Sequence, residues 1–183
     1  MLLQLEFITL LRMDFRGFNI QLATLFGLGR IPGGGTWASL LVLLIALYEQ
    51  NAESASFLAF FTLIIAPKAY QKLTVESKNE DPKEYVLDEV IGMGIALTGV
   101  YVFYSIAGEF YFNINFFSDI DVLFILTFVI FRFFDISKIG PVGWVENNLN
   151  EKPYNRVIGD DIMASFLSIL VVIIILSINL WVL

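Results

Sequence analysis

Residues 162–183 read IMASFLSILVVIIILSINLWVL, an apolar run that contains no charged side chain. Its length suits a helix that crosses a bilayer, which needs roughly 17–25 residues. Residues 90–107, VIGMGIALTGVYVFYSIA, form a second run of this kind. Backbone N–H and C=O groups inside lipid must find partners within the protein, and a helix provides them within one segment. The two runs therefore predict an all-α protein with membrane-spanning helices.

Three shorter apolar segments, residues 37–48, 55–70 and 122–134, extend this pattern. They reach across a bilayer only if their helices continue into the flanking residues or the bilayer thins locally. The stretch 2–15, LLQLEFITLLRMDF, is apolar but interrupted by charges, which favours an interfacial or packed helix. We therefore expect a polytopic membrane helical bundle of about five apolar helices plus an N-terminal interfacial helix, with residues 1–183 as a single domain.

The composition also favours a membrane protein. Hydrophobic residues make up 57% of the chain and charged residues 16%, compared with about 25% charged in a typical globular protein. An all-α soluble or half-immersed bundle with buried helices is the alternative. The chain has no Cys and no His, which excludes disulfides, cysteine nucleophiles, Ser-His-Asp triads and ordinary zinc sites. The net charge of −7 argues against nucleic acid as a partner.

Basic residues are distributed unevenly along the chain. None of the 11 Lys and Arg residues lies in 49–54 or 108–121, and none follows Arg156. They lie before the first apolar segment, between the second and third, or around the loop that joins the fourth and fifth. By the positive-inside rule these regions face the cytoplasm, and the C-terminus lies outside. The three polar motifs of the chain all fall on this inner side.

The first motif is a glycine-rich loop ahead of the first apolar segment. Residues 27–36 read GLGRIPGGGT. Backbone N–H groups that converge in such a loop, together with the positive end of the following helix dipole, favour an anion such as phosphate. No Gly-Lys-Ser/Thr follows, so this is not a Walker loop. The alternative is a flexible hinge in which Thr36 only caps the next helix.

The second motif is a pair of adjacent acids, Asp88 and Glu89, at the entrance to the third apolar segment. A similar pair, Asp160 and Asp161, stands where the last segment begins. Carboxylates are expensive to bury in a membrane and usually have a function there. Hard divalent cations take oxygen ligands, so each pair is a credible part of a Mg²⁺ site. The alternative is that the acids only cap their helices at the interface.

The third motif is Arg132, Asp135 and Lys138, spaced three residues apart. This spacing places a cation, a carboxylate and a second cation along one face of a helix. Arg offers a fork to phosphate oxygens, and Lys offers a point charge. The alternative makes both cations topology anchors that pair with the acids. All three motifs on one membrane surface together favour metal-assisted phosphoryl transfer.

The runs GLGRIPGGGTWASL, YVLDEVIGM and FRFFDISKIGP followed by DDIMAS resemble, in this order and spacing, the phosphatidylglycerophosphatase A family. The resemblance covers residues 26–165. It implies a phosphoric monoester hydrolase of the bacterial cytoplasmic (inner) membrane, with its active site on the cytoplasmic face. Such an enzyme requires Mg²⁺ and converts phosphatidylglycerophosphate to phosphatidylglycerol and phosphate in phospholipid synthesis.

Carried over by position, the resemblance assigns the metal and catalytic acids to five residues: Asp88, Glu89, Asp135, Asp160 and Asp161. It assigns the phosphate-holding groups to four others: Gly35, Thr36, Arg132 and Lys138. Which acid binds metal and which orients water stays open. So does a non-enzymatic alternative, a small membrane transporter or a scaffold subunit. A transporter predicts acids spread along a pore, whereas these acids stand at the ends of the apolar segments.

Overall fold

The structure, a computed structural model, describes residues 17–80, 82–110, 119–149 and 153–182, and all regular structure in them is helical. This confirms the predicted all-α class. The elements after the helical residues 17–23 are the 3₁₀ turn η1 (Leu28–Arg30), α2 (Gly34–Glu49), α3 (Glu53–Ser77), α4 (Leu87–Phe110), α5 (Ile120–Ser137), α6 (Pro141–Asn148) and α7 (Pro153–Val182). The predicted N-terminal helix 2–15 lies outside the described residues.

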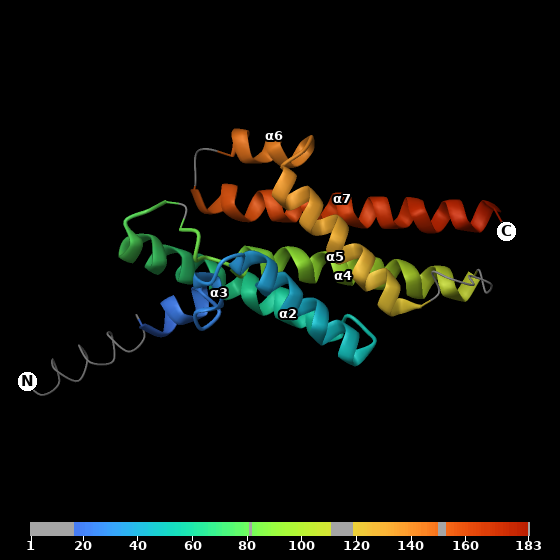
Figure 1. Ribbon diagram of the computed structural model, residues 1–183, viewed down its shortest axis with the longest axis horizontal. Helices are drawn as coiled ribbons and strands as arrows, with labels where there is room; N and C mark the ends of the chain where they lie inside the picture. The colour runs from blue at the N-terminus through green and yellow to red at the C-terminus, as the bar shows by residue number, and fades with distance from the viewer. Residues whose placement is uncertain (1–16, 81, 111–118, 150–152, 183) are drawn as a thin grey trace, which may run out of the picture.

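Helix α4 is the centre of the bundle. It packs against α2, α3, α5 and α7. Helix α7 also packs against α5 and the short helix α6. Figure 1 shows α4 and α7 running along the long axis of the molecule, with α6 over the beginning of α7. Every segment that carries a polar motif therefore packs directly on α4 or on its neighbour α7.

Two helices are long and apolar enough to cross a membrane, through Leu87–Ile106 in α4 and Pro153–Ile178 in α7. The expectation of about five such helices is not confirmed. Helix α2 has only 16 residues, and α5 carries charged side chains near both ends of its 18 residues. The remaining shorter segment, 55–70, lies in α3, which is long enough at 25 residues but is not among the two candidate spans.

Apolar side chains are exposed in a regular pattern on α7. Phe166, Leu170, Ile174 and Ile178 recur every four residues, and their exposed fractions are 58%, 53%, 48% and 58%. Residues at this spacing lie on one face of a helix. A continuous apolar stripe that no other part of the described structure covers fits contact with lipid.

Two helix boundaries differ from the predictions. Helix α7 begins at Pro153, a residue well suited to the first helical position. The pair Asp160–Asp161 therefore lies in the third turn rather than at the helix start. Helix α6 was not predicted, and it also begins at a proline, Pro141, after Gly140 with φ 64°.

Candidate metal and phosphate site

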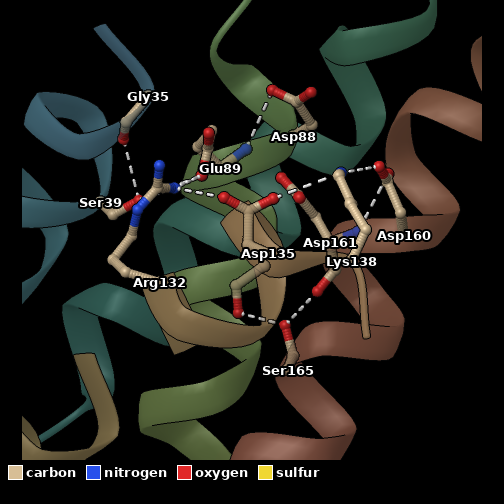
Figure 2. A network of polar contacts seen from close by, with 11 residues as sticks. Gly35, Ser39, Asp88, Glu89, Arg132, Asp135, Lys138, Asp160, Asp161 and Ser165 are labelled. Carbon is tan, nitrogen blue, oxygen red and sulfur yellow. Dashed lines mark hydrogen bonds and ion pairs between the residues drawn. The ribbon is translucent and has the colours of Figure 1, made fainter. Parts of the chain in front are cut away.

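Three acids from three different helices converge at one end of the bundle. Glu89 comes from the first turn of α4, Asp135 from the last turn of α5, and Asp161 from the third turn of α7. One carboxylate oxygen from each lies within 4.8 Å of the other two. Figure 2 shows these side chains pointing toward one another. Residues 46 and 26 positions apart in the chain thus form one cluster of oxygen ligands.

Asp161 supplies the strongest indication that this cluster holds a cation. Its side chain is buried, with only 3% of its surface exposed, and its Oδ2 atom accepts no hydrogen bond from any described residue. A buried carboxylate oxygen without a partner is costly. Oxygen ligands of this kind suit a hard divalent ion such as Mg²⁺, so the residues present fit the metal that the sequence motifs predict.

Arg132 bridges two of the three acids. Its Nη1 donates to Glu89 Oε2, and the same nitrogen lies 2.8 Å from Asp135 Oδ2. These side chains are almost buried, with exposed fractions of 12%, 13% and 9%. Arg132 Nε is also buried and has no hydrogen-bond partner among the described residues. The guanidinium therefore orders the acids and still has a donor to offer.

Lys138 holds the fourth acid of the group, Asp160. Its Nζ donates to Asp160 Oδ2 and lies 3.5 Å from Asp135 Oδ1. Burial of the ammonium works against its charge. The hydrogen bond to Asp160 and the charges of Asp160 and Asp135 outweigh this and raise the pKa of Lys138 above its usual value. Lys138 is therefore a permanent cation beside the cluster. Arg132 and Asp135 share one face of α5, whereas Lys138 is the left-handed C-cap just after the helix, at φ 51°, and reaches Asp135 from there.

Asp88 lies at the rim of the site. Its Oδ1 accepts the Glu89 N–H at 3.0 Å, and no ion pair to it is found in the described part of the chain. The neighbouring phenol of Tyr85 is buried, and both its burial and the charge of Asp88 raise its pKa. Tyr85 therefore stays neutral beside Asp88.

The glycine loop lies next to the acids, although its end differs from the prediction. Helix α2 starts at Gly34, with Gly33 as its N-cap at φ 74°. Gly35 and Thr36 are therefore inside the first turn, and Thr36 is not the cap. Glycine at 33 explains the difference, because it adopts the left-handed conformation without strain. The loop also borders a surface pocket of about 580 Å³, where Arg30 pairs with Glu84 at 3.0 Å.

Ser39 belongs to the site and was missed from the sequence. It is fully buried in α2. Its Oγ lies 2.9 Å from the Gly35 carbonyl oxygen, 3.2 Å from Glu89 Oε2 and 3.3 Å from Arg132 Nη1. The hydroxyl thus links α2 to the acid and to the guanidinium. A lone serine in an apolar run carries no signal of this kind, because only packing brings it to Glu89.

We expect Ser39→Ala to lower the rate of phosphate release about tenfold while the protein remains folded. Outer-shell partners of metal ligands typically contribute 10–100-fold, and this hydroxyl is a partner of both Glu89 and Arg132. Ser168→Ala is the matched control, since Ser168 is equally buried but bonds only to the Ala164 carbonyl of its own helix. Equal rates for the two variants would contradict a positioning role for Ser39.

Gly35 is required by close packing rather than by turn geometry. A Cβ atom on Gly35 would overlap with Oε1 of Glu89. We expect Gly35→Ala to displace this carboxylate and lower the rate of phosphate release, although alanine favours a helix over glycine by about 1 kcal/mol. The measurement is activity together with thermal stability. Gly17→Ala is the control, because a Cβ there meets no atom within 4 Å; an unchanged rate in Gly35→Ala would contradict the expectation.

Gly92 and Ser165 hold the helices of the site together. A Cβ on Gly92 would come within 2.8 Å of the Phe131 ring and 3.1 Å of Asp161 Cβ, so glycine allows α5 and α7 to approach α4 closely. Ser165 Oγ lies 2.7 Å from both the Gly92 and the Asp161 carbonyl oxygens. These contacts fix the positions of Asp135 and Asp161 relative to Glu89.

The family model of phosphatidylglycerophosphatase A matches residues 21–176 of the chain. The match includes every acid, cation and glycine of the site. The chain belongs to the phosphatidylglycerophosphatase A family. No curated protein and no solved structure matches the chain.

Membership in the phosphatidylglycerophosphatase A family confirms the resemblance seen in the sequence motifs, and it makes the protein a phosphatidylglycerophosphatase. The family is metal-dependent and membrane-associated, and its substrate is phosphatidylglycerophosphate. The acid cluster and the two apolar helices agree with these properties. An enzyme is therefore favoured over a transporter or a scaffold, and the acids gather at one end of the bundle rather than along a pore.

Proposed function

We propose that this protein is a Mg²⁺-dependent lipid phosphatase that hydrolyses phosphatidylglycerophosphate to phosphatidylglycerol and phosphate at the cytoplasmic face of a bacterial inner membrane. The observation that carries this proposal is the convergence of Glu89, Asp135 and Asp161, with the Asp161 Oδ2 atom buried and unpartnered. In the sequence, the basic residues lie at the same ends of the apolar segments as the acids. Since basic residues favour the cytoplasmic side of a membrane, this supports a site at the cytoplasmic face.

Glu89, Asp135 and Asp161 would hold the metal ion. A divalent cation bound by these three carboxylates would supply positive charge that polarises a phosphoryl oxygen. Asp160 does not enter this ligand set directly, because its carboxylate is engaged by Lys138. We assign Asp160 the role of holding Lys138 beside the cluster.

Arg132 and Lys138 would hold the phosphate. Arg132 keeps a buried, unpartnered Nε donor, and charge-assisted hydrogen bonds to phosphate are among the stronger polar contacts. The first turn of α2, with Gly35 and Thr36, adds backbone N–H groups and the positive end of a helix dipole near Glu89. These groups would stabilise negative charge on the phosphoryl oxygens as it shifts during the reaction.

Asp88 is the residue we assign to the attacking water. It is half-exposed at the rim and pairs with no cation among the described residues. In the reaction, the water oxygen bonds to phosphorus and the bond from phosphorus to the glycerol oxygen breaks. Asp88 accepts a proton from the water and returns this proton to the glycerol oxygen as it leaves.

Removal of divalent cations tests the metal requirement. We expect EDTA to abolish phosphate release from phosphatidylglycerophosphate in detergent micelles, and added Mg²⁺ to restore it, because three carboxylates lie close together. The purified parent protein is measured with chelator, with chelator plus excess Mg²⁺, and with Mg²⁺ alone. Full activity in EDTA after extensive dialysis would overturn the metal assignment.

A further inference from the structure

A groove of about 400 Å³ opens on the face of α4 that lies between α3 and α7. Its walls are almost entirely apolar, formed mainly by Phe60 and Leu63 of α3, Ile91, Ile95 and Gly99 of α4, and Phe166 of α7. Phe60 and Phe166 are 62% and 58% exposed. The groove is therefore open to the surroundings of the helices, not sealed in the core.

The groove begins one helical turn after Asp88. Ile91, Ile95 and Gly99 follow Asp88 at three, seven and eleven residues, which places all four on one face of α4. The part of this face that lines the groove, from Ile91 to Gly99, rises roughly 12 Å along the helix. This is somewhat less than half of the ~30 Å hydrocarbon thickness of a bilayer, so the groove fits within the depth of one leaflet.

The residues that line the groove determine which kind of ligand can bind in it. Its α4 and α7 walls belong to the two stretches long and apolar enough to cross a membrane. Its only hydroxyls are Ser56 and Thr98, which bond to each other at 2.7 Å and to backbone carbonyls of their own helices. The walls therefore offer hydrocarbon contact and no charged group to a ligand.

We propose that this groove binds one acyl chain of the phospholipid whose phosphate lies at the acid cluster. The inference rests on the proposed function and adds the place where the lipid tail is held. The register of α4 carries it: one helix face bears Asp88 and, from one turn further on, the residues that line the apolar groove. An acyl chain of the same lipid molecule can therefore occupy the groove while the head group lies at the acids.

Close packing sets the width of the groove. Gly99 lets Ile169 of α7 pack against α4, because Ile169 already fills the space that a Cβ at position 99 would need. Ala59 of α3 adds a small side chain to the groove wall. A bulky side chain introduced between these positions would narrow the groove, whereas the same side chain elsewhere on the exposed surface of α4 would not.

Ile95→Trp and Val102→Trp test this with one chemical change at two places. Ile95 lines the groove and Val102 is 50% exposed on α4 outside it. Phosphate release is measured with dioleoyl phosphatidylglycerophosphate and with its deacylated head group. We expect Ile95→Trp to raise KM for the lipid about tenfold, equivalent to lost burial of about two methylene groups. Hydrolysis of the deacylated compound, and both activities of Val102→Trp, should stay at the parent level.

A binding measurement keeps the inference independent of turnover. Phosphatidylglycerophosphate and phosphatidylcholine carrying the same photoactivatable acyl chain are each cross-linked to the parent protein, and the labelled peptides are identified by mass spectrometry. We expect the phosphatidylglycerophosphate probe to label Phe60, Ile95 or Phe166 preferentially, and Ile95→Trp to reduce this labelling.

The outcomes separate the two proposals. Equal labelling of the groove by both lipids would show ordinary surrounding lipid and overturn the acyl-chain site, as would equal KM values for Ile95→Trp and Val102→Trp. A loss of turnover on both substrates in Ile95→Trp alone would also overturn it. A parent protein that releases no phosphate would instead refute the proposed function. The comparison of labelling by the two lipids would still test whether the groove binds the acyl chain.

Discussion

Replacing Asp161 by asparagine is expected to lower the turnover number for phosphatidylglycerophosphate by about a hundredfold or more. Asp161 contributes one of the three converging carboxylate oxygens, and its Oδ2 is buried without a hydrogen-bond partner. The amide keeps the size of the side chain but removes its charge and introduces a donor into the cluster. Phosphate release at saturating Mg²⁺ is the measurement.

The same substitution should leave stability unchanged or raise it, because it replaces a buried carboxyl group whose Oδ2 accepts no hydrogen bond from the described residues. Loss of turnover with an unchanged or higher melting temperature in detergent is the combination that identifies a functional carboxylate. Asp119→Asn is the matched control: Asp119 caps α5 at the far end of that helix from Asp135, and asparagine is an equally good cap. Retention of more than about a tenth of the parent rate in Asp161→Asn would refute the assignment.

Replacing Arg132 by glutamine should affect both activity and stability. Arg132 is the cation shared by Glu89 and Asp135, and all three side chains are nearly buried. Removing one partner of such a buried group leaves uncompensated charge and typically costs about 3–5 kcal/mol. Removal of an oxyanion donor typically lowers turnover about 10²–10³-fold. We therefore expect a lower melting temperature together with a loss of phosphate release.

A double variant separates the two effects. Arg132→Gln combined with Glu89→Gln removes the cation and one of its anions, so stability should recover in part while activity does not. Arg132→Lys keeps the charge without the planar fork and should recover stability more than turnover. Arg30→Gln is the surface control, because Arg30 pairs with Glu84 at 59% and 40% exposure and such pairs contribute about 0–1 kcal/mol. Full turnover in Arg132→Gln would refute its phosphate-binding role.

The helical class and the chemistry of the site could be predicted from local patterns. The charge-free runs 90–107 and 162–183 require helices in lipid, and the two candidate membrane spans, Leu87–Ile106 in α4 and Pro153–Ile178 in α7, coincide with most of them. The spacing of Arg132 and Asp135 predicts one helix face, because backbone geometry alone determines it. The number of complete spans could not be predicted in this way, since it depends on where each helix begins and ends.

Helix boundaries changed the meaning of two motifs. The glycine at position 33 starts α2 early, which moves Gly35 and Thr36 into its first turn. Pro153 likewise starts α7 before the acidic pair, which puts Asp160 and Asp161 in the third turn. Both shifts come from single residues with unusual backbone preferences, which apolar periodicity does not detect.

The sequence by itself determined which residue types are available: no histidine or cysteine, five acids in the second and third motifs, and two charge-free apolar runs of membrane-spanning length. Only the tertiary structure decided which of the acids meet. Glu89, Asp135 and Asp161 form one cluster, whereas Asp160 accepts a hydrogen bond from Lys138. The reason is that local spacing sets the face of a helix, whereas contacts between helices depend on close packing at positions such as Gly35 and Gly92.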